Sequence, residues 1–272
     1  MWDNIINYFS TLEERPLERM AFLVGGMLFF WILEGAIPLL TLRFRKTRVR
    51  HAAINFGLTI IHLIIHTFLA IIIIKISDWC AVNQFGLVYW AGTGILATIL
   101  ITILVVDFFG GWLVHIIEHK FRFLWLFHVI HHADTNVDVT TGLRHHPVES
   151  VVRGIFFFMG IFVSGAPMFA VMIYQTVLVF FTAFEHANIR LPKQIDMAMS
   201  YLFISPNMHK VHHHRQQPYT DSNYGAIFSI WDRLLGTYKY LEPPQLRYGI
   251  DKDYPEEKDE DFLQMLKNPF QK

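Results

Sequence analysis

The sequence predicts an all-α fold: an integral-membrane helical bundle with a histidine-rich site for two metal ions on its cytoplasmic side. Composition gives the first indication, because 53% of the 272 residues are hydrophobic and only 17% are charged, against about 25% in an ordinary soluble protein. The second is a set of long apolar stretches. The third is an excess of histidines, fifteen in all, many of which recur at the spacing of one helix face.

Charge and cysteine content exclude several classes of protein. The 23 basic residues are balanced by 23 acidic ones, so there is no basic surplus with which to bind a nucleic-acid backbone. Cys80 is the only cysteine, which excludes an intrachain disulfide, a cysteine-ligated zinc site and an iron–sulfur cluster built by this chain alone. Residues 1–19 are polar and do not resemble a cleaved signal peptide.

Four apolar stretches predict the membrane segments. A membrane-spanning helix needs about 20 apolar residues, and three stretches meet this requirement, residues 20–42, 52–74 and 85–106. The fourth, residues 154–184, is interrupted by Gly165-Ala166-Pro167, which predicts two half-helices joined by a turn. Residues 154–164 would be about 16 Å long, so we expect a shallow or re-entrant hairpin. A single tilted helix is the alternative, and it would divide the histidines between the two sides of the membrane.

The loop after the first apolar stretch sets the orientation. It contains five basic residues and no acidic one, namely Arg43, Arg45, Lys46, Arg48 and Arg50. By the positive-inside rule this loop is cytoplasmic, and with the hairpin every histidine from His115 onward falls on the same side. We therefore expect one multi-pass domain over residues 1–242, followed by a polar acidic C-terminal tail over residues 243–272.

The histidines form three groups with helical spacing. The groups read "HIIEH", "HVIHH" and "HKVHH" and contain His115 and His119, then His128, His131 and His132, then His209, His212 and His213. Residues at i, i+3 and i+4 share a helix face, and neutral imidazole is the commonest metal ligand. Eight imidazoles exceed the needs of one ion but suit two ions with four to six ligands each. His186 is a ninth candidate, whereas His214 lies about 140° around the helix from His209 and is expected to be only a neighbour.

Three other interpretations stay open at this point. "HIIEH" also matches the HxxEH motif of zinc metallopeptidases, in which Glu118 would be the general base. A metal transporter would hold its ligands near the middle of the membrane. A non-catalytic lipid-binding protein is the third possibility.

Between Asp107 and Tyr240 the ordered motifs HxxxH, HxxHH, "RHHPVE", HxxHH, "NYG" and "WDRLLGTY" resemble the fatty acid hydroxylase/sterol desaturase superfamily. The resemblance implies a di-iron centre that uses O2 to hydroxylate or desaturate a sterol-like or fatty acyl lipid. Because imidazole also binds zinc well, zinc is expected as a possible substitute in purified samples. It implies nine metal ligands: His115, His119, His128, His131, His132, His186, His209, His212 and His213. The electrons are expected from a separate protein, cytochrome b5-like or ferredoxin-like, because the chain has one cysteine and no dinucleotide-binding motif.

Further polar residues lie close to these motifs. His146 matches the histidine of the superfamily's His-Pro pair, and we expect it to support the ligands or to face the substrate. The same role is expected of four carboxylates, Asp107, Asp138, Glu149 and Asp232, because ligating histidines need an acceptor for their other ring nitrogen. Glu118, Asp134 and Glu185 are also near the motifs. The resemblance assigns no role to His145.

Overall fold

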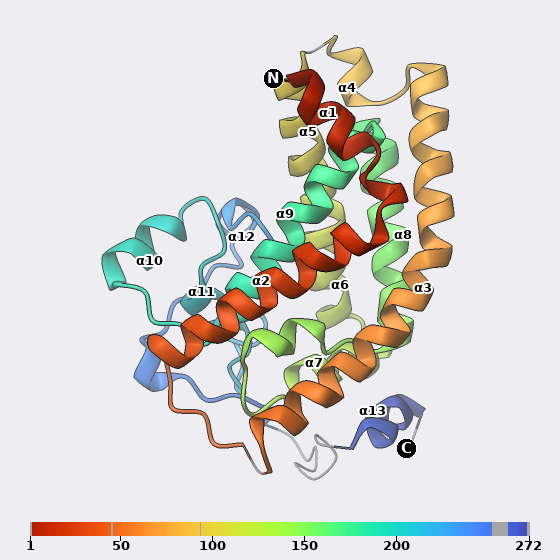
Figure 1. The fold of residues 1–272 in the computed structure, drawn as a ribbon. Helices are drawn as coiled ribbons and strands as arrows, with labels where there is room; N and C mark the ends of the chain where they lie inside the picture. Colours follow the sequence, from red (N-terminus) through yellow and green to blue (C-terminus); the bar gives the residue numbers. More distant parts are fainter. Residues whose placement is uncertain (1, 45, 93, 252–260, 271–272) are drawn as a thin grey trace.

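The computed structural model describes residues 2–44, 46–92, 94–251 and 261–270. These residues form an all-helical bundle, as predicted, and among them only two isolated bridges, Pro38 with Ile189 and Phe203 with Phe228, have β geometry. Figure 1 shows the long helices side by side, with most of the shorter helices beside or below the middle of the bundle.

Among the described residues, five helical stretches are long and apolar enough to cross a membrane. They are α2 (Pro16–Ala36), α3 (Arg48–Asn83), α5 (Ile95–Asp107) with its continuation, α8 (Pro147–Ser164) and α9 (Met168–His186). The helix that begins as α5 continues through a π-helical segment, η2 (Phe108–Leu113), into α6 (Val114–Lys120). The three spans predicted from the first apolar stretches are thus found, and the protein is a multi-pass membrane protein.

The fourth apolar stretch is a helical hairpin, but its helices are not short. Gly165, in the left-handed conformation with φ +70°, ends α8, and Pro167 precedes α9. A side chain at Gly165 would collide with the carbonyl oxygen of Phe85, so the turn is seated closely on the loop after α3. The expected half-helix of about 16 Å is wrong, because α8 begins at Pro147 and has 18 residues.

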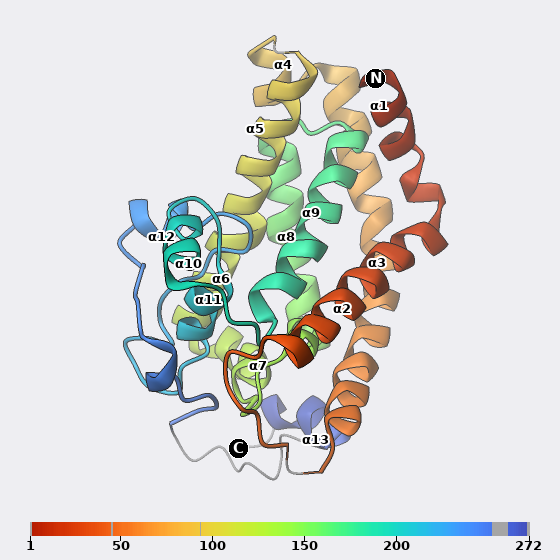
Figure 2. The ribbon, with the colours of Figure 1, turned by 60° about the vertical axis from the view of Figure 1, so that its left-hand side comes forward.

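The two ends of the bundle differ in content (Figure 2). One end holds α1 (Trp2–Ser10), α4 (Leu87–Trp90) and the turn of the hairpin. The other holds α7 (Arg122–His132), η3 (Val139–Leu143), α11 (Pro206–His212) and α13 (Phe262–Lys267). The remaining short helices are α10 (Lys193–Met199), α12 (Ile230–Leu234), and the 3-10 turns η1 (Leu12–Glu14), η4 (Pro243–Gln245) and η6 (Asn268–Phe270).

The basic loop lies at the histidine end of the bundle, in agreement with the order of spans expected from the sequence. The backbone N–H of Arg43 donates to Oδ1 of Asn136 at 2.8 Å. Arg48 pairs with Glu34 of α2 and with Asp138, the residue that caps η3. Arg45 lies outside the described residues.

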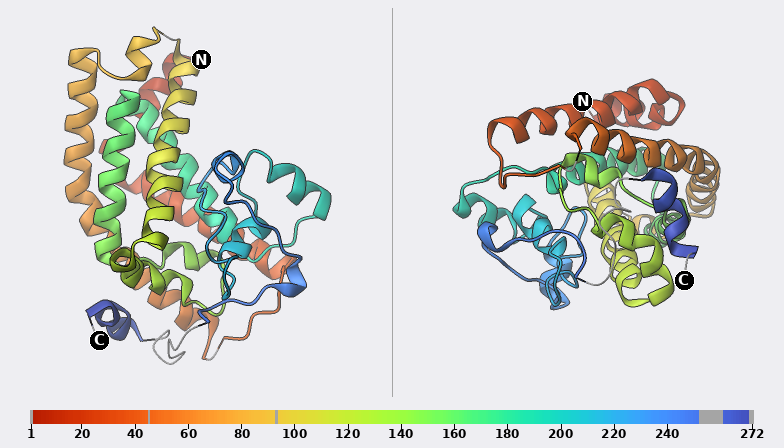
Figure 3. Two further views of the ribbon diagram at one scale, coloured as in Figure 1. Left: turned by 180° about the vertical axis from the view of Figure 1, so that it is seen from behind. Right: turned by 90° about the horizontal axis from the view of Figure 1, so that it is seen from below.

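The end of the chain packs against the bundle. Met265 of α13 is fully buried in one cluster with Leu58 of α3 and Ile130 of α7, and Figure 3 shows α13 from below, beside these helices. Residues 252–260, which carry most of the acidic charge expected of the tail, lie outside the described residues. The division into residues 1–242 and 243–272 stays a prediction, but α13 is part of the packed structure.

The hairpin makes the topology testable by labelling. In a Cys80→Ala background, Arg122→Cys before the hairpin and Gln216→Cys after it should react with an impermeant maleimide from the same side of sealed vesicles. Val82→Cys, at the opposite end of α3, should react from the other side. Labelling of the first two positions from opposite sides would contradict the hairpin, and the side that reacts with the first two is expected to be the cytoplasmic one.

Candidate metal centre

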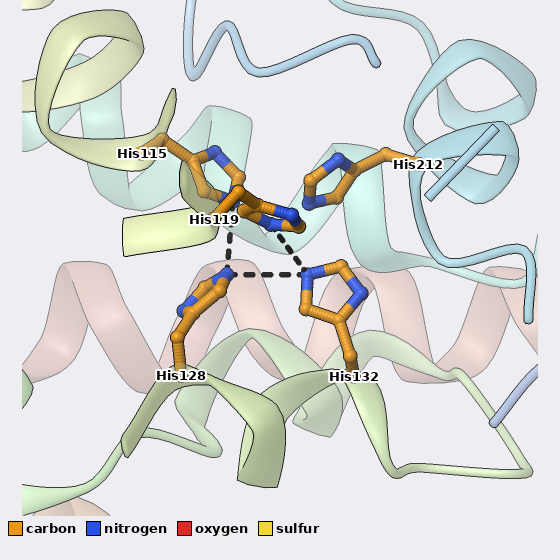
Figure 4. Close-up of side chains that lie close together, drawn as sticks. All are labelled: His115, His119, His128, His132 and His212. Atoms are coloured by element: carbon orange, nitrogen blue, oxygen red, sulfur yellow. Dashed lines mark hydrogen bonds between the residues drawn. The ribbon is translucent and has the colours of Figure 1, made fainter. Parts of the chain in front are cut away.

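The structure brings the nine predicted histidines together in two buried groups. In each group one nitrogen of every ring lies within 4.8 Å of the others. The first group, drawn in Figure 4, contains five residues, His115, His119, His128, His132 and His212. The second group contains four residues, His131, His186, His209 and His213. Four separate segments, α6, α7, the end of α9 and α11, supply them.

Each HxxHH motif serves both groups. In α7, His128 and His132 enter the first group, while His131 enters the second. In α11 the assignment is reversed: His212 enters the first group, while His209 and His213 enter the second. The i and i+4 residues thus stay together and the i+3 residue is separated from them. Each of the two helices is consequently fixed to both groups.

Backbone carbonyls determine which nitrogen points inward in the first group. Nδ1 of His115 donates to the carbonyl of Tyr224 at 2.9 Å, and Nδ1 of His212 donates to the carbonyl of Ser222 at 2.7 Å. A carbonyl can only accept, so Nδ1 carries the proton in both rings. In a neutral imidazole the other nitrogen, Nε2, then presents a lone pair.

Carboxylates favour the same tautomer, with the proton on Nδ1, in two further imidazole rings. Nδ1 of His128 lies 2.9 Å from Oε1 of Glu149, and Nδ1 of His119 lies 3.2 Å from Oδ1 of Asp221. Although burial opposes it, hydrogen bonds from His119 and Lys120 lower the pKa of Asp221. Asp221 is therefore an ionised acceptor, and four of the five rings in the first group point an Nε2 lone pair inward.

These inward nitrogens face one another closely (Figure 4). Nε2 of His128 lies 3.1 Å from Nε2 of His115 and 3.1 Å from Nε2 of His132, which is itself 3.1 Å from Nε2 of His119. Burial lowers the pKa of His128 to about 3, so protonation is not available to relieve the contact. In the contact between His115 and His128 both Nε2 atoms carry lone pairs, which repel at this separation unless a cation lies between them.

In the second group only His186 has an acceptor for its outer nitrogen among the described residues, because Nδ1 of His131, His209 and His213 has no hydrogen-bond partner. Nδ1 of His186 donates to the carbonyl of Thr182 at 2.8 Å, which directs its Nε2 inward. That nitrogen lies 3.2 Å from Nε2 of His131 and 3.0 Å from Nε2 of His209, and Nε2 of His213 follows at 3.2 Å from His209. Burial also lowers the pKa of His131, His209 and His213 well below that of free imidazole. The donor set of both groups suits iron, copper, nickel or zinc.

The polar residues expected around the ligands have different positions. Glu149 contacts a histidine of the groups directly, through His128, and its Oε1 also lies 2.8 Å from Nδ1 of His145. Asp232 acts one step away, because it accepts from the backbone N–H of Tyr224 at 2.8 Å, and the carbonyl of Tyr224 binds His115. Asp107 accepts from the N–H groups of Ile227 and Phe228 and fixes that loop to the end of α5.

Asp138 and His146 make their contacts elsewhere. Asp138 caps η3 and pairs with Arg48. Nδ1 of His146 accepts from the N–H of Val148 at the start of α8, and its Nε2 faces the carbonyl of Leu266 in α13 at 3.3 Å. Among the described residues neither has a hydrogen bond to a histidine of the two groups. His214, as expected, lies outside both groups, with Nδ1 accepting from the N–H of Arg247.

Two supporting residues were missed from the sequence. Asp221 binds His119. Its separation from His212 along the sequence matches neither helix nor strand periodicity, so no motif indicates this contact. Lys210 lies between two ligand positions on the other face of α11, where a lysine is normally solvated, yet it is fully buried. Its ammonium donates to the carbonyls of Glu185, His186 and Ala187 at 2.9, 2.5 and 3.1 Å, and it thereby holds the end of α9 that carries His186.

The fold and site define a multi-pass membrane protein with a buried, histidine-rich centre built for metal. A family model described as fatty acid hydroxylase matches residues 99–237, half of the chain. The chain belongs to this family, which confirms the resemblance found in its motifs.

Three curated relatives show the range of similar proteins. An ornithine lipid hydroxylase of Rhizobium tropici is 26% identical over 58% of this chain and 46% of its own length. Alkylglycerol monooxygenases of Xenopus tropicalis and Homo sapiens are 30% and 24% identical over 55% and 52% of this chain, and over 32% and 31% of their own lengths. The chain therefore spans less than half the length of these relatives. No solved structure matches it.

Glu149→Gln tests the support of the first group. The amide removes the negative charge that Oε1 presents to His128 and Arg153, so we expect metal affinity to fall about 10–100-fold. Glu14→Gln, an exposed position at the other end of the bundle, is the matched control. Metal titration that found equal affinity for Glu149→Gln and the unaltered protein would contradict this role.

Lys210→Met tests the clamp on α9. It leaves three buried carbonyls without their charged donor, and hydrogen bonds to charged groups contribute about 1.5–3 kcal/mol each, so a clearly lower thermal midpoint is expected in detergent. Lys239→Met, which alters an exposed lysine, should leave the midpoint unchanged. Equal midpoints for the two variants would show that the three contacts do not stabilise the fold.

Proposed function

We propose that this protein is an O2-dependent lipid hydroxylase in which each histidine group holds one iron ion. The observation that carries the proposal is the convergence of nine buried imidazoles in two groups, five of which give their outward N–H to a fixed acceptor. The relatives, by their names, hydroxylate or oxygenate lipids. The corresponding reaction is R–H + O2 + 2 e⁻ + 2 H⁺ → R–OH + H2O.

The roles of the residues follow from their contacts. His115, His119, His128, His132 and His212 would hold one ion, and His131, His186, His209 and His213 the other. The iron would supply the redox chemistry with which O2 attacks an unactivated C–H bond. Glu149, Asp221 and the carbonyls of Thr182, Ser222 and Tyr224 keep the rings neutral and oriented. Zinc would also bind such imidazoles in purified samples.

The substrate is proposed to be a membrane lipid, sterol-like or fatty acyl. The spans place the centre at the end of a lipid-facing bundle, and the names of the relatives specify an ornithine lipid and an alkylglycerol. Both names describe oxygen insertion, which favours hydroxylation over desaturation for this chain as well.

Electrons must come from outside the chain in this proposal. One cysteine and no dinucleotide-binding motif leave it without a reductase of its own, so a cytochrome b5-like or ferredoxin-like protein would dock on the side of the histidines. The exposed basic residues Arg43, Lys46 and Arg50 lie at that end, which supports a cytoplasmic location of the site.

The arrangement of Glu118 counts against a zinc metallopeptidase. Its Oε2 accepts from the guanidinium of Arg153 at 2.7 Å, so the carboxylate is held in an ion pair instead of facing a metal-bound water. The two histidines of "HIIEH" also share their group with three further imidazoles, whereas a catalytic zinc has three protein ligands and keeps one position open for water.

Two neighbouring histidines test the proposal. We expect the purified protein to bind two metal ions per chain, and to add one oxygen from ¹⁸O2 to lipid when iron, a reduced donor protein and membranes are supplied. His213→Ala removes a ring of the second group and should lose metal and product. His214→Ala removes a ring outside both groups and should keep two ions and most of the turnover.

The outcomes are read from metal analysis and mass spectrometry of the lipids. One zinc per chain, with no activity on addition of iron, would contradict the di-iron proposal. A metal-poor, inactive His214→Ala variant would show that the ligand assignment is wrong. Turnover with NAD(P)H and O2 alone would remove the need for a separate electron donor.

A further inference from the structure

Large apolar side chains are exposed on a part of the chain that is not a membrane span. They belong to α10, α12 and the loop between α10 and α11, and comprise Ile195, Tyr201, Leu202, Leu234 and Leu235, with exposed fractions from 46% to 75%. We call this surface the α10–α12 surface. Contiguous apolar patches of this kind on a protein surface mark a contact with another apolar phase or partner.

Hydrogen bonds make the two halves of the surface one unit. The N–H of Ser229, just before α12, donates to the carbonyl of Leu202 at 3.1 Å. Nε of Arg233 donates to the carbonyl of Ser200 at 2.7 Å. The Arg233 guanidinium also lies over the ring of Tyr201, 4.3 Å from its centroid. The apolar side chains next to these residues are therefore held on one rigid support.

Contacts with the long helix place this unit at a definite depth. The indole N–H of Trp231 in α12 donates to Oδ2 of Asp107 at 3.0 Å, and its ring lies 5.1 Å from that of Phe108. Asp107 and Phe108 follow Ile95, the first residue of α5, by 12 and 13 residues, or about 18–20 Å of helix. The hydrocarbon core of a bilayer is about 30 Å thick. If Ile95 lies at one boundary, α12 joins the helix within the opposite leaflet.

The boundary near Ile95 has the expected marker. Trp90, 64% exposed, precedes the helix, and exposed tryptophans are enriched where a membrane meets water. The ribbon agrees with this depth: in Figures 1 and 2, α10 and α12 lie beside the middle of the bundle at the height of α2, above α7 and α13. The α2 helix is itself strongly lipid-facing, with Ile32 70% exposed.

We propose that the α10–α12 surface is inserted into the leaflet on the histidine side, at the boundary between headgroups and acyl chains. Ile195, Leu202, Leu234 and Leu235 enter the acyl region, while Tyr201 and Arg233 remain at headgroup level, as amphipathic side chains do. The surface is a membrane contact additional to the five spans. It continues the lipid-facing side of α5 through the contact between Phe108 and Trp231.

The inserted segments lead directly to the metal centre. Three residues after Leu202, the Ser205 side chain caps α11, which carries His209 and His212. Asp232 in α12 binds the N–H of Tyr224, whose carbonyl holds His115. The contact with the leaflet therefore fixes the depth at which both histidine groups lie relative to the lipid headgroups.

Depth-dependent quenching tests this assignment without using activity. Leu234→Cys, in a Cys80→Ala background, is labelled with an environment-sensitive fluorophore and the full-length protein is reconstituted in phosphatidylcholine vesicles. We expect quenching by lipids spin-labelled near the headgroup, and several-fold weaker quenching by aqueous iodide than at Gln216→Cys, an exposed polar position after α11. Ile195→Cys on α10 is a second reporter in case the first variant fails to fold.

Two results would overturn the proposal. Iodide quenching at Leu234 and Ile195 equal to that at Gln216 would place the surface in water. Protection from both iodide and the spin-labelled lipids would show that protein covers it, as in an association of two copies of this chain.

Discussion

The site depends on one physical constraint: five of the nine imidazoles give their outward N–H to a fixed acceptor, and this turns their other ring nitrogen inward. In a dry interior an N–H without an acceptor is costly. The acceptors of His115 and His212 are carbonyls of the loop 222–224, and that of His186 is a carbonyl of its own helix. Loop 222–224 must therefore lie against α6 and α11, and Asp107 and Asp232 hold its continuation there. The long-range hydrogen bonds of Asp107 and Asp232 thus help to keep the imidazole rings of the site oriented.

The buried charged side chains at the histidine end of the bundle are also held by fixed partners. Buried ions are tolerated when they are paired and hydrogen-bonded, and those within membrane segments usually have a function. Arg153 binds both Glu118 and Glu149, so the carboxylate that orients His128 is itself fixed from α8. This network links α6, α7 and α8 and explains why the charged residues of α8 lie in its first two turns, beside the site.

The sequence was sufficient for the helical class, the hairpin and the identity of the clustered histidines, because spacing and hydropathy are local properties. The sequence did not predict the features that depend on contacts between distant segments of the chain. The apolar stretch begins at residue 154, after the charged Glu149 and Arg153, whereas the pairing of these two residues allows α8 to begin at Pro147. The burial of Lys210 depends on three carbonyls from a different helix, and carbonyl acceptors have no signature in a sequence. The division of each HxxHH motif between two groups likewise depends on how α7 and α11 face each other.

The π-helical segment Phe108–Leu113 joins the membrane part of the long helix to the site. Such segments add a residue to the turn and are frequent at functional sites. Here the wider turn lies where Asp107 anchors residues 227–231, and it changes the rotational register of α6 relative to α5. Gly111 allows the close approach, since a Cβ there would lie 3.0 Å from that of Ala226. His115, 20 residues after Ile95, then lies about 30 Å along the helix, at the edge of the hydrocarbon core. If Ile95 lies at one boundary of the core, the histidine groups therefore lie at the opposite boundary, where the headgroups meet the acyl chains.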